Sequence, residues 1–161
     1  MSKEETWGMT EEEMRGRVVK LAFGGDEGRF REFVEAVRGA VPRGTTVVLR
    51  GSSVTGERYD DGAPFDADGP GTSDLDLTLV GTEILGEYIL DGFYLPGVHT
   101  KPLSDKDPDI APNLIPLRER LQKMVGRPVN IQATRDIWMR LRGDWLGQPY
   151  LTLIGEVGKS E

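Results

Sequence analysis

The feature that most constrains the fold is the segment Asp74–Val80, in which polar residues and leucines alternate strictly. Successive side chains of a β-strand point to opposite faces of the sheet. Three leucines then share one face and three polar residues share the other: Leu75, Leu77 and Leu79 against Asp74, Asp76 and Thr78. We therefore expect a half-buried strand whose leucine face contacts the core and whose other face carries two carboxylates.

Helical periodicity dominates the sequence on either side of this strand. Thr10 and Glu13 have the spacing of a capping box and predict a helix to about Ala22. A second helix is expected over residues 26–40 and a third over 112–125, with Gly126 at the position that ends many helices. A fourth is expected to begin at Thr134 and to end near residue 142.

Short apolar runs predict three further strands, over residues 45–49, 129–133 and 150–154. The segment 54–73 is rich in Gly, Asp and Pro, and we expect a long loop there. Within residues 81–111 only 84–90 has a helical pattern. The expected fold class is α/β (α+β), a small mixed β-sheet with helices packed on one face and the site on the opposite, open face. One domain should span residues 1–161, with 1–9 flexible.

Composition excludes several classes of function. With no cysteine, the chain has no disulfide framework, thiolate metal site or cysteine nucleophile. The net charge of −7 disfavours a broad basic surface for duplex DNA or an anionic membrane. The polar N-terminus and the lack of a long apolar run predict neither a signal peptide nor a membrane span, so we expect a cytoplasmic protein.

Asp74 and Asp76 are the first candidates for chemistry. Two like charges on one strand face repel each other, and a divalent cation between them removes that conflict. Carboxylate oxygens are the ligands that Mg²⁺ prefers, and Mn²⁺ accepts them as well. The alternative is a solvated strand face with two ordinary surface aspartates.

The second candidate is the turn Gly51-Ser52-Ser53, which directly follows the strand expected at 45–49. Glycine lets the backbone turn sharply and approach a ligand closely. We expect the amides and the two hydroxyls to face one volume and to bind phosphate oxygens. A plain Gly-Ser turn is the alternative, and the turn is not a Walker A loop, which needs a second glycine and a Lys-Ser/Thr pair.

Together, the strand ending in Gly51-Ser52 and the later Asp74-Leu75-Asp76 strand resemble the DNA polymerase beta-like nucleotidyltransferase superfamily. The resemblance implies a metal-dependent nucleotidyltransferase, an enzyme that moves a nucleoside monophosphate from an NTP to a hydroxyl of RNA, protein or a small molecule. Asp74 and Asp76 would be catalytic metal ligands for Mg²⁺ or Mn²⁺, and Gly51, Ser52 and Ser53 would bind the nucleotide. The loop between the two motifs is longer than usual and contains an insertion, residues 55–72.

Further segments are similar to nucleotidyltransferase-like domains of bacterial polymorphic toxins. These segments are Arg50–Gly56, Ala63–Asp66, Ser73–Asp76, Thr100–Leu103 and Gly126–Asn130. This resemblance implies a bacterial toxin domain with a possible antitoxin or immunity protein as partner. Lys101, in the loop region, is a nucleotide-binding candidate because a lysine meets a phosphate as a point charge. A solvated lysine is the alternative reading of Lys101.

One position departs from the superfamily pattern. Asn130 occupies the place expected for a third catalytic carboxylate, and a carboxamide can ligate a metal but cannot accept a proton. The general base is therefore unassigned, with Asp66, Asp68 and Asp136 as candidates. Two other functions stay open, a nucleotide-binding pseudoenzyme and an interaction module without transfer activity.

The remaining charged residues give weaker signals. Arg50, directly before Gly51, is expected to pair with Asp74 or with phosphate. The basic residues near the helix expected at 112–125 should lie mostly on its solvated face: Arg118, Arg120, Lys123 and Arg127. His99 is the only histidine, and no nucleophile motif supports a triad built on it.

Overall fold

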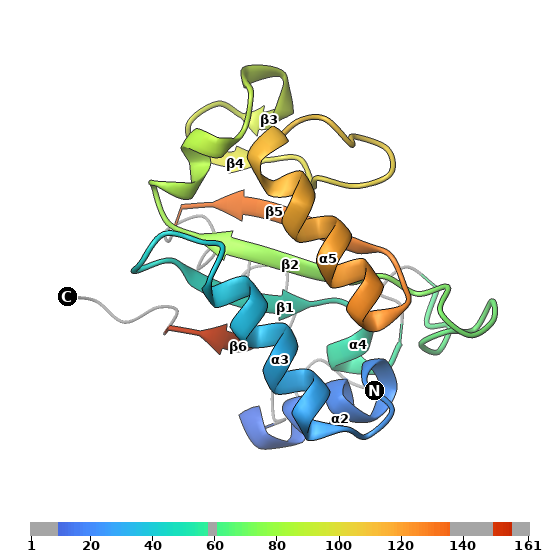
Figure 1. Cartoon of the computed structure of the whole chain (residues 1–161). Coiled ribbons are helices and arrows are strands. Elements are labelled where there is room, and N and C mark those ends of the chain that lie inside the picture. The colour runs from blue at the N-terminus through green and yellow to red at the C-terminus, as the bar shows by residue number, and fades with distance from the viewer. Residues whose placement is uncertain (1–9, 58–60, 136–149, 156–161) are drawn as a thin grey trace.

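The computed structural model describes residues 10–57, 61–135 and 150–155. Within them a mixed six-stranded sheet has the order β3-β4-β5-β2-β1-β6, and β2 and β5 are the one parallel pair (Figure 1). The strands are β1 (Thr46–Arg50), β2 (Leu75–Val80), β3 (Phe93–Leu95), β4 (His99–Thr100), β5 (Val129–Thr134) and β6 (Tyr150–Ile154). The mixed α/β class expected from the sequence is confirmed.

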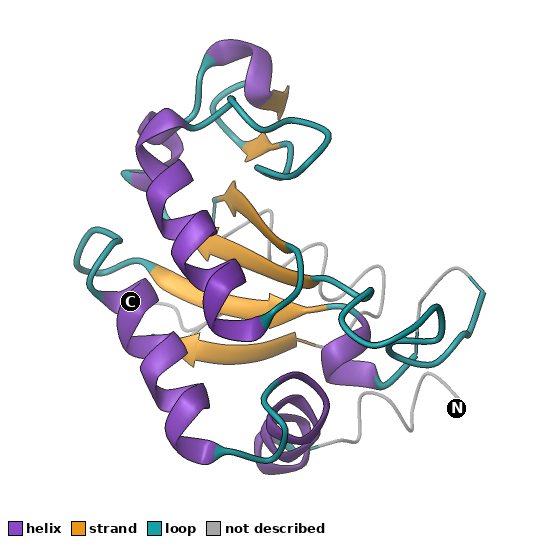
Figure 2. Ribbon diagram, turned by 45° about the vertical axis from the view of Figure 1, so that its right-hand side comes forward, coloured by secondary structure: helices purple, strands orange, loops and turns teal. Residues whose placement is uncertain are grey.

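The longer described helices cover one face of this sheet (Figures 1 and 2). They are α2 (Glu11–Ala22), α3 (Glu27–Arg38) and α5 (Ile115–Val125). Shorter helical elements are α4 (Ser52–Thr55), η1 (Ile84–Glu87), η2 (Leu90–Gly92) and η3 (Pro112–Leu114). Among the described residues, none of these helices combines the length and apolar character that crossing a bilayer requires.

The ends of the helices follow from local chemistry. Thr10 and Glu13 form the predicted capping box of α2, in which each side chain binds the other residue's amide. Asp26 caps α3 by accepting from the Arg29 amide. Gly126 ends α5 in the left-handed conformation, with φ of 66°. These three predicted helix boundaries are confirmed to within two residues.

The core lies between the helices and the sheet. Every second residue of β2 is buried there, as the leucine alternation predicts, beside the matching residues of β1 and β5. Within this core, the ring of Phe23 makes edge-to-face contacts with the rings of Phe30 and Phe33. The second face of the sheet is less open than expected, because Val48, Val80 and Thr78 on that face are also buried.

Three expectations about secondary structure are corrected. Ser52–Thr55 form a short helix where a turn and the start of a long loop were expected, and residues 81–111 contain β3 and β4 as well as the two 3-10 turns. Thr134 is the last residue of β5 and not a helix cap, while residues 136–142 of the helix expected there lie outside the described residues. Two- and three-residue strands bury too few side chains to leave a periodic signal.

Candidate functional site

Strand pairing brings the predicted site residues together at one end of the sheet. Arg50, the last residue of β1, pairs with Asp76 near the start of β2. Asp76 in turn pairs with Asn130 of β5 in parallel register. Residues paired in register lie on the same face of the sheet, so Arg50, Asp76 and Asn130 form one row across three strands. This face is opposite the leucine core, as the alternation of β2 requires.

Asn130 joins the two carboxylates. Its Nδ2 donates to Asp74 Oδ2 at 2.8 Å and to Asp76 Oδ1 at 3.0 Å. Asp74, directly before β2, therefore points toward the same volume as Asp76. Both aspartates and Asn130 are partly exposed, so a ligand in water can reach the cluster. This contact brings Asn130, the position where the family resemblance implies a third carboxylate, beside both aspartates.

Asp76 has an unusual ionisation. Burial, reinforced by the negative charge of Asp74, raises its pKa to about 6. The hydrogen bond from Asn130 and the charge of Arg50 act in the opposite direction and limit the rise. The carboxylate pair is therefore a place where an additional positive charge is favourable, which is the physical condition for cation binding.

Gly51 lies against Asp76. Its φ of 90° is accessible mainly to glycine, and a Cβ atom built on it would lie 2.9 Å from Asp76 Oδ2. A side chain at this position would therefore collide with the carboxylate. The close approach gives a physical reason for glycine between β1 and α4, because no side chain from residue 51 then stands beside Asp76.

The two serines after Gly51 have different surroundings. Ser52 is partly exposed, whereas Ser53 is fully buried, and no described contact satisfies its hydroxyl. The expectation that both hydroxyls face one volume is wrong, because neighbouring residues of a helical turn point about 100° apart. Arg17 of α2 holds this turn by donating to Thr55 O at 2.9 Å and to Val54 O at 3.3 Å.

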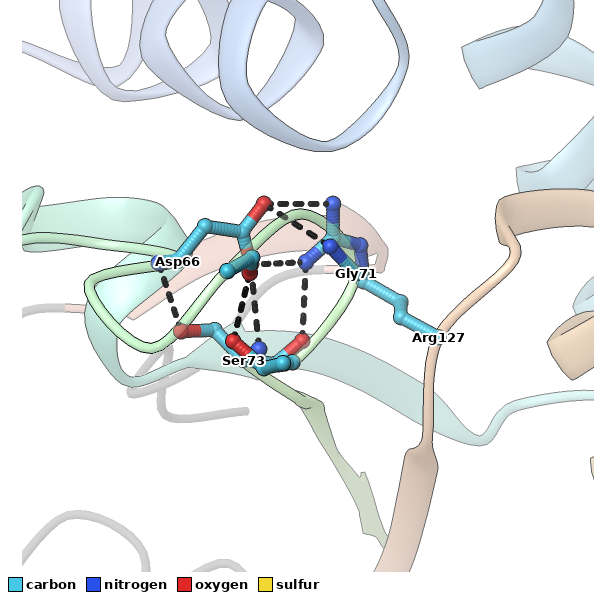
Figure 3. A network of polar contacts seen from close by, with 6 residues as sticks. Asp66, Gly71, Ser73 and Arg127 are labelled. Atoms are coloured by element: carbon cyan, nitrogen blue, oxygen red, sulfur yellow. Dashed lines mark hydrogen bonds and ion pairs between the residues drawn. The ribbon is translucent and has the colours of Figure 1, made fainter.

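A polar network fixes the insertion between the two motifs (Figure 3). Arg127 Nη1 and Nη2 donate to the two carboxylate oxygens of Asp66, at 2.8 and 3.1 Å. The same Nη1 donates to Ser73 O at 2.8 Å, and the amides of Gly71 and Ser73 donate to Asp66 as well. The Arg127 guanidinium also lies 4.5 Å from the centre of the Phe65 ring. The network joins the insertion to Ser73, which directly precedes Asp74.

This network corrects two expectations. Arg127 is not on a solvated helix face, because its side chain is only 7% exposed. Arg118, outside this network, is also buried, where it donates to Val129 O and pairs with Asp105. The hydrogen bond from Arg127, joined by those of two amides, lowers the pKa of Asp66 to about 2 against the effect of burial. A carboxylate held in this way is a weak base, so Asp66 is a poor candidate for the general base.

Of the other two candidates for the base, Asp68 is exposed in the same insertion, and Asp136 lies outside the described residues. A signal for Arg127 was present in the sequence, because an arginine between Gly126 and Pro128 cannot continue the helix. Its partner 61 residues away could not be identified from spacing.

Lys101 and His99 lie on the other side of β5. The Lys101 amide donates to Gly92 O, and among the contacts of the described residues none joins its side chain to Asp74 or Asp76. His99 Nε2 lies 3.0 Å from Gln132 Nε2, and its ring stacks on Tyr94. Neither residue meets the carboxylate pair in the described contacts.

The donor atoms at the site suit a hard divalent cation. Within the described part of the chain, no group of three or more His, Cys, Asp or Glu residues is placed to hold a metal ion. Asp74 and Asp76 supply two carboxylates, and Asn130 Oδ1 is a possible third oxygen ligand. A cation at this place would need oxygen atoms from water or from a bound phosphate to complete its coordination.

Comparison of the chain with protein-family models, with curated proteins and with solved structures finds no match.

Proposed function

We propose that this chain is a nucleotidyltransferase-like domain that binds a nucleoside triphosphate with Mg²⁺ or Mn²⁺ at Asp74 and Asp76. The observation that carries the proposal is the convergence of two motifs 23 residues apart, Gly51 and Asp74, at one end of the sheet. Gly51 directly faces Asp76, and Asn130 contacts both aspartates. Chance placement of a Gly-Ser turn and an Asp-x-Asp strand would not require this contact.

The chain's own residues supply binding and orientation. Asp74 and Asp76 provide the carboxylates for the cation, and Arg50 limits the negative charge around Asp76. Gly51 lets the backbone approach the phosphates, and Ser52 offers a partly exposed hydroxyl beside it. A bound divalent cation neutralises the charge that develops on the transferred phosphoryl group.

The proposed reaction is transfer of a nucleoside monophosphate. The oxygen of an acceptor hydroxyl on RNA, protein or a small molecule forms a bond to the α-phosphorus. The bond from that phosphorus to the β-phosphate oxygen breaks, pyrophosphate leaves, and the hydroxyl proton passes to water. We assign no protein base to this proton, because Asn130 stands where a third carboxylate is expected and Asp66 is paired with Arg127.

A nucleotide-binding domain without transfer activity is the second candidate. The amide at position 130 favours it, because an asparagine cannot accept the proton of the acceptor. Both candidates predict metal-dependent binding of an NTP at the same residues, and they differ only in whether the α-phosphate is transferred.

The test is label transfer from each of the four α-labelled NTPs, with Mg²⁺ or Mn²⁺, to total bacterial RNA and protein. We expect covalent label with the wild-type chain and none with Asp74→Asn/Asp76→Asn. The matched control is Asp107→Asn/Asp109→Asn, which removes two acidic groups in the loop before η3 and should retain transfer. NTP binding without label would support the second candidate, and label from the Asp74→Asn/Asp76→Asn variant would contradict both.

A further inference from the structure

The contact between Asn130 and the two carboxylates has a consequence for how the site accepts a cation. Both hydrogen atoms of a carboxamide lie on its nitrogen, and here that nitrogen donates to Asp74 and to Asp76. The partial positive charge of the NH₂ group thus lies between the carboxylates. In this arrangement the NH₂ group reduces the repulsion between the two carboxylates, as a bound cation would.

The same orientation conflicts with cation binding. A hard divalent cation accepts oxygen ligands and not an amide NH₂ group. With Nδ2 engaged by the carboxylates, Oδ1 is directed away from them. A cation between Asp74 and Asp76 therefore requires Nδ2 to leave, and only a reversed carboxamide would bring Oδ1 to the cation.

Strand pairing holds the backbone at position 130, whereas the side chain is held by its two hydrogen bonds to the aspartates. Val129 and Ile131 are fully buried on either side, and β5 pairs with β2 along its whole length. The Asn130 side chain is partly exposed. Rotation about its side-chain bonds is therefore enough to exchange Nδ2 for Oδ1, and no movement of the strand is needed.

We propose that Asn130 is a reversible amide lock on the carboxylate pair, and that it sets the site's affinity for a free divalent cation. Without a cation, Nδ2 holds Asp74 and Asp76 together. When the cation binds, the carboxamide reverses and presents Oδ1. Because two hydrogen bonds must first break, the free cation binds weakly, and the cation bound to a triphosphate is the favoured ligand. This inference rests on the proposed function, of which it describes the metal loading.

A carboxylate at position 130 should remove the lock. Asn130→Asp has nearly the same shape, has no NH₂ group and adds one negative charge. We expect it to bind free Mn²⁺ at least about tenfold more tightly than the wild type, because the two hydrogen bonds that a cation must break are absent and a third carboxylate is present.

Gln132→Glu is the matched control. Gln132 is the next residue of β5 on the same face, and its Nε2 donates to Thr100 O, away from the aspartates. This variant makes the same change of net charge on the same strand, but its side chain is directed toward Thr100 and supplies no ligand to the carboxylate pair, so it should leave Mn²⁺ affinity within about twofold of wild type.

The first measurement is Mn²⁺ titration followed by electron paramagnetic resonance, on the wild type and both variants, with folding checked by circular dichroism. The second needs no variant that might fail to fold. In ¹⁵N-labelled wild type, the Asn130 side-chain NH₂ signals, assigned by their absence from Asn130→Asp, should shift and lose their protection from solvent exchange when Mg²⁺ and ATP are added. Equal Mn²⁺ affinity of Asn130→Asp and Gln132→Glu would overturn the lock.

The lock and the proposed function fail in different ways. If the wild type binds Mg²⁺ with ATP while the Asn130 signals stay unchanged, the lock is wrong and the proposed site stands. If no NTP binds with any metal, the proposed function is wrong. The Mn²⁺ comparison of the two variants then still decides whether Asn130 controls the carboxylate pair.

Discussion

The Asp66–Arg127 pair offers the clearest quantitative prediction about stability. Asp66→Asn removes the charge and keeps the shape of the side chain. Asp66 has φ of 61°, and asparagine tolerates this left-handed backbone better than most residues, so the substitution adds little backbone strain. The variant therefore isolates the ion pair and its hydrogen bonds.

The expected magnitude follows from the pKa of Asp66, which falls from 3.8 to about 2 on folding. One pKa unit corresponds to about 1.4 kcal/mol, and part of the carboxylate remains in contact with water, so we expect a loss of about 1 to 2 kcal/mol at pH 7. Because folding lowers this pKa, the stabilisation is complete above pH 4. It is lost as the pH falls from about 4 to 2.

The assay is urea denaturation of the wild type and Asp66→Asn at pH 7 and at pH 2.5. The difference in free energy of unfolding should be present at pH 7 and should shrink at pH 2.5. Asp109→Asn, at an exposed aspartate, is the control and should cost less than about 0.5 kcal/mol. A cost for Asp66→Asn that is equal at both pH values, or no larger than that of the control, would refute the reasoning.

Three further substitutions test other contacts of the site. Gly51→Ala should weaken Mg²⁺–ATP binding, because its Cβ would lie 2.9 Å from Asp76 Oδ2. Its control is Gly44→Ala, at a similar φ of 92° in open space: backbone strain should lower the free energy of unfolding of both variants by ~1 to 2 kcal/mol, but Gly44→Ala should bind Mg²⁺–ATP normally. Asp76→Asn should raise the free energy of unfolding at pH 7 by about 1 kcal/mol in the absence of metal. Folding raises the pKa of Asp76 to about 6, so the wild type loses stability as the pH rises from about 4 to 6, and the variant does not. Unchanged stability in a urea titration would contradict this. Arg17→Met should lower the melting temperature and weaken Mg²⁺–ATP binding, because the Arg17 guanidinium donates to the carbonyls at the end of α4. Its control, Arg15→Met, removes an exposed ion pair and should leave Mg²⁺–ATP binding unchanged.

Sequence patterns predicted the parts of the fold that depend on local chemistry. The alternation in β2 determined which residues face the core, and the Thr10–Glu13 capping box determined where α2 begins. The same alternation placed Asp74 and Asp76 on the face opposite the leucines. The contact of both aspartates with Asn130 depends on the order and register of β2 and β5, which no sequence pattern predicted.

The rest depends on contacts between residues distant in the sequence. Arg127 pairs with Asp66 across 61 positions, which no periodic pattern records. The burial of Ser53 depends on how α4 packs, so the sequence suggested two equivalent serines where the structure has one buried and one partly exposed. The orientation of the Asn130 amide is likewise set by its two partners.

The central claim is that Asp74 and Asp76, beside Gly51, bind a cation together with a nucleoside triphosphate. Isothermal titration calorimetry with each NTP, in the presence and absence of Mg²⁺, measures this directly. We predict metal-dependent binding of at least one NTP to the wild type. Asp74→Asn/Asp76→Asn should weaken that binding at least about tenfold, and Asp107→Asn/Asp109→Asn should not. Absence of binding for all four NTPs with Mg²⁺, or equal binding by Asp74→Asn/Asp76→Asn, would contradict the claim.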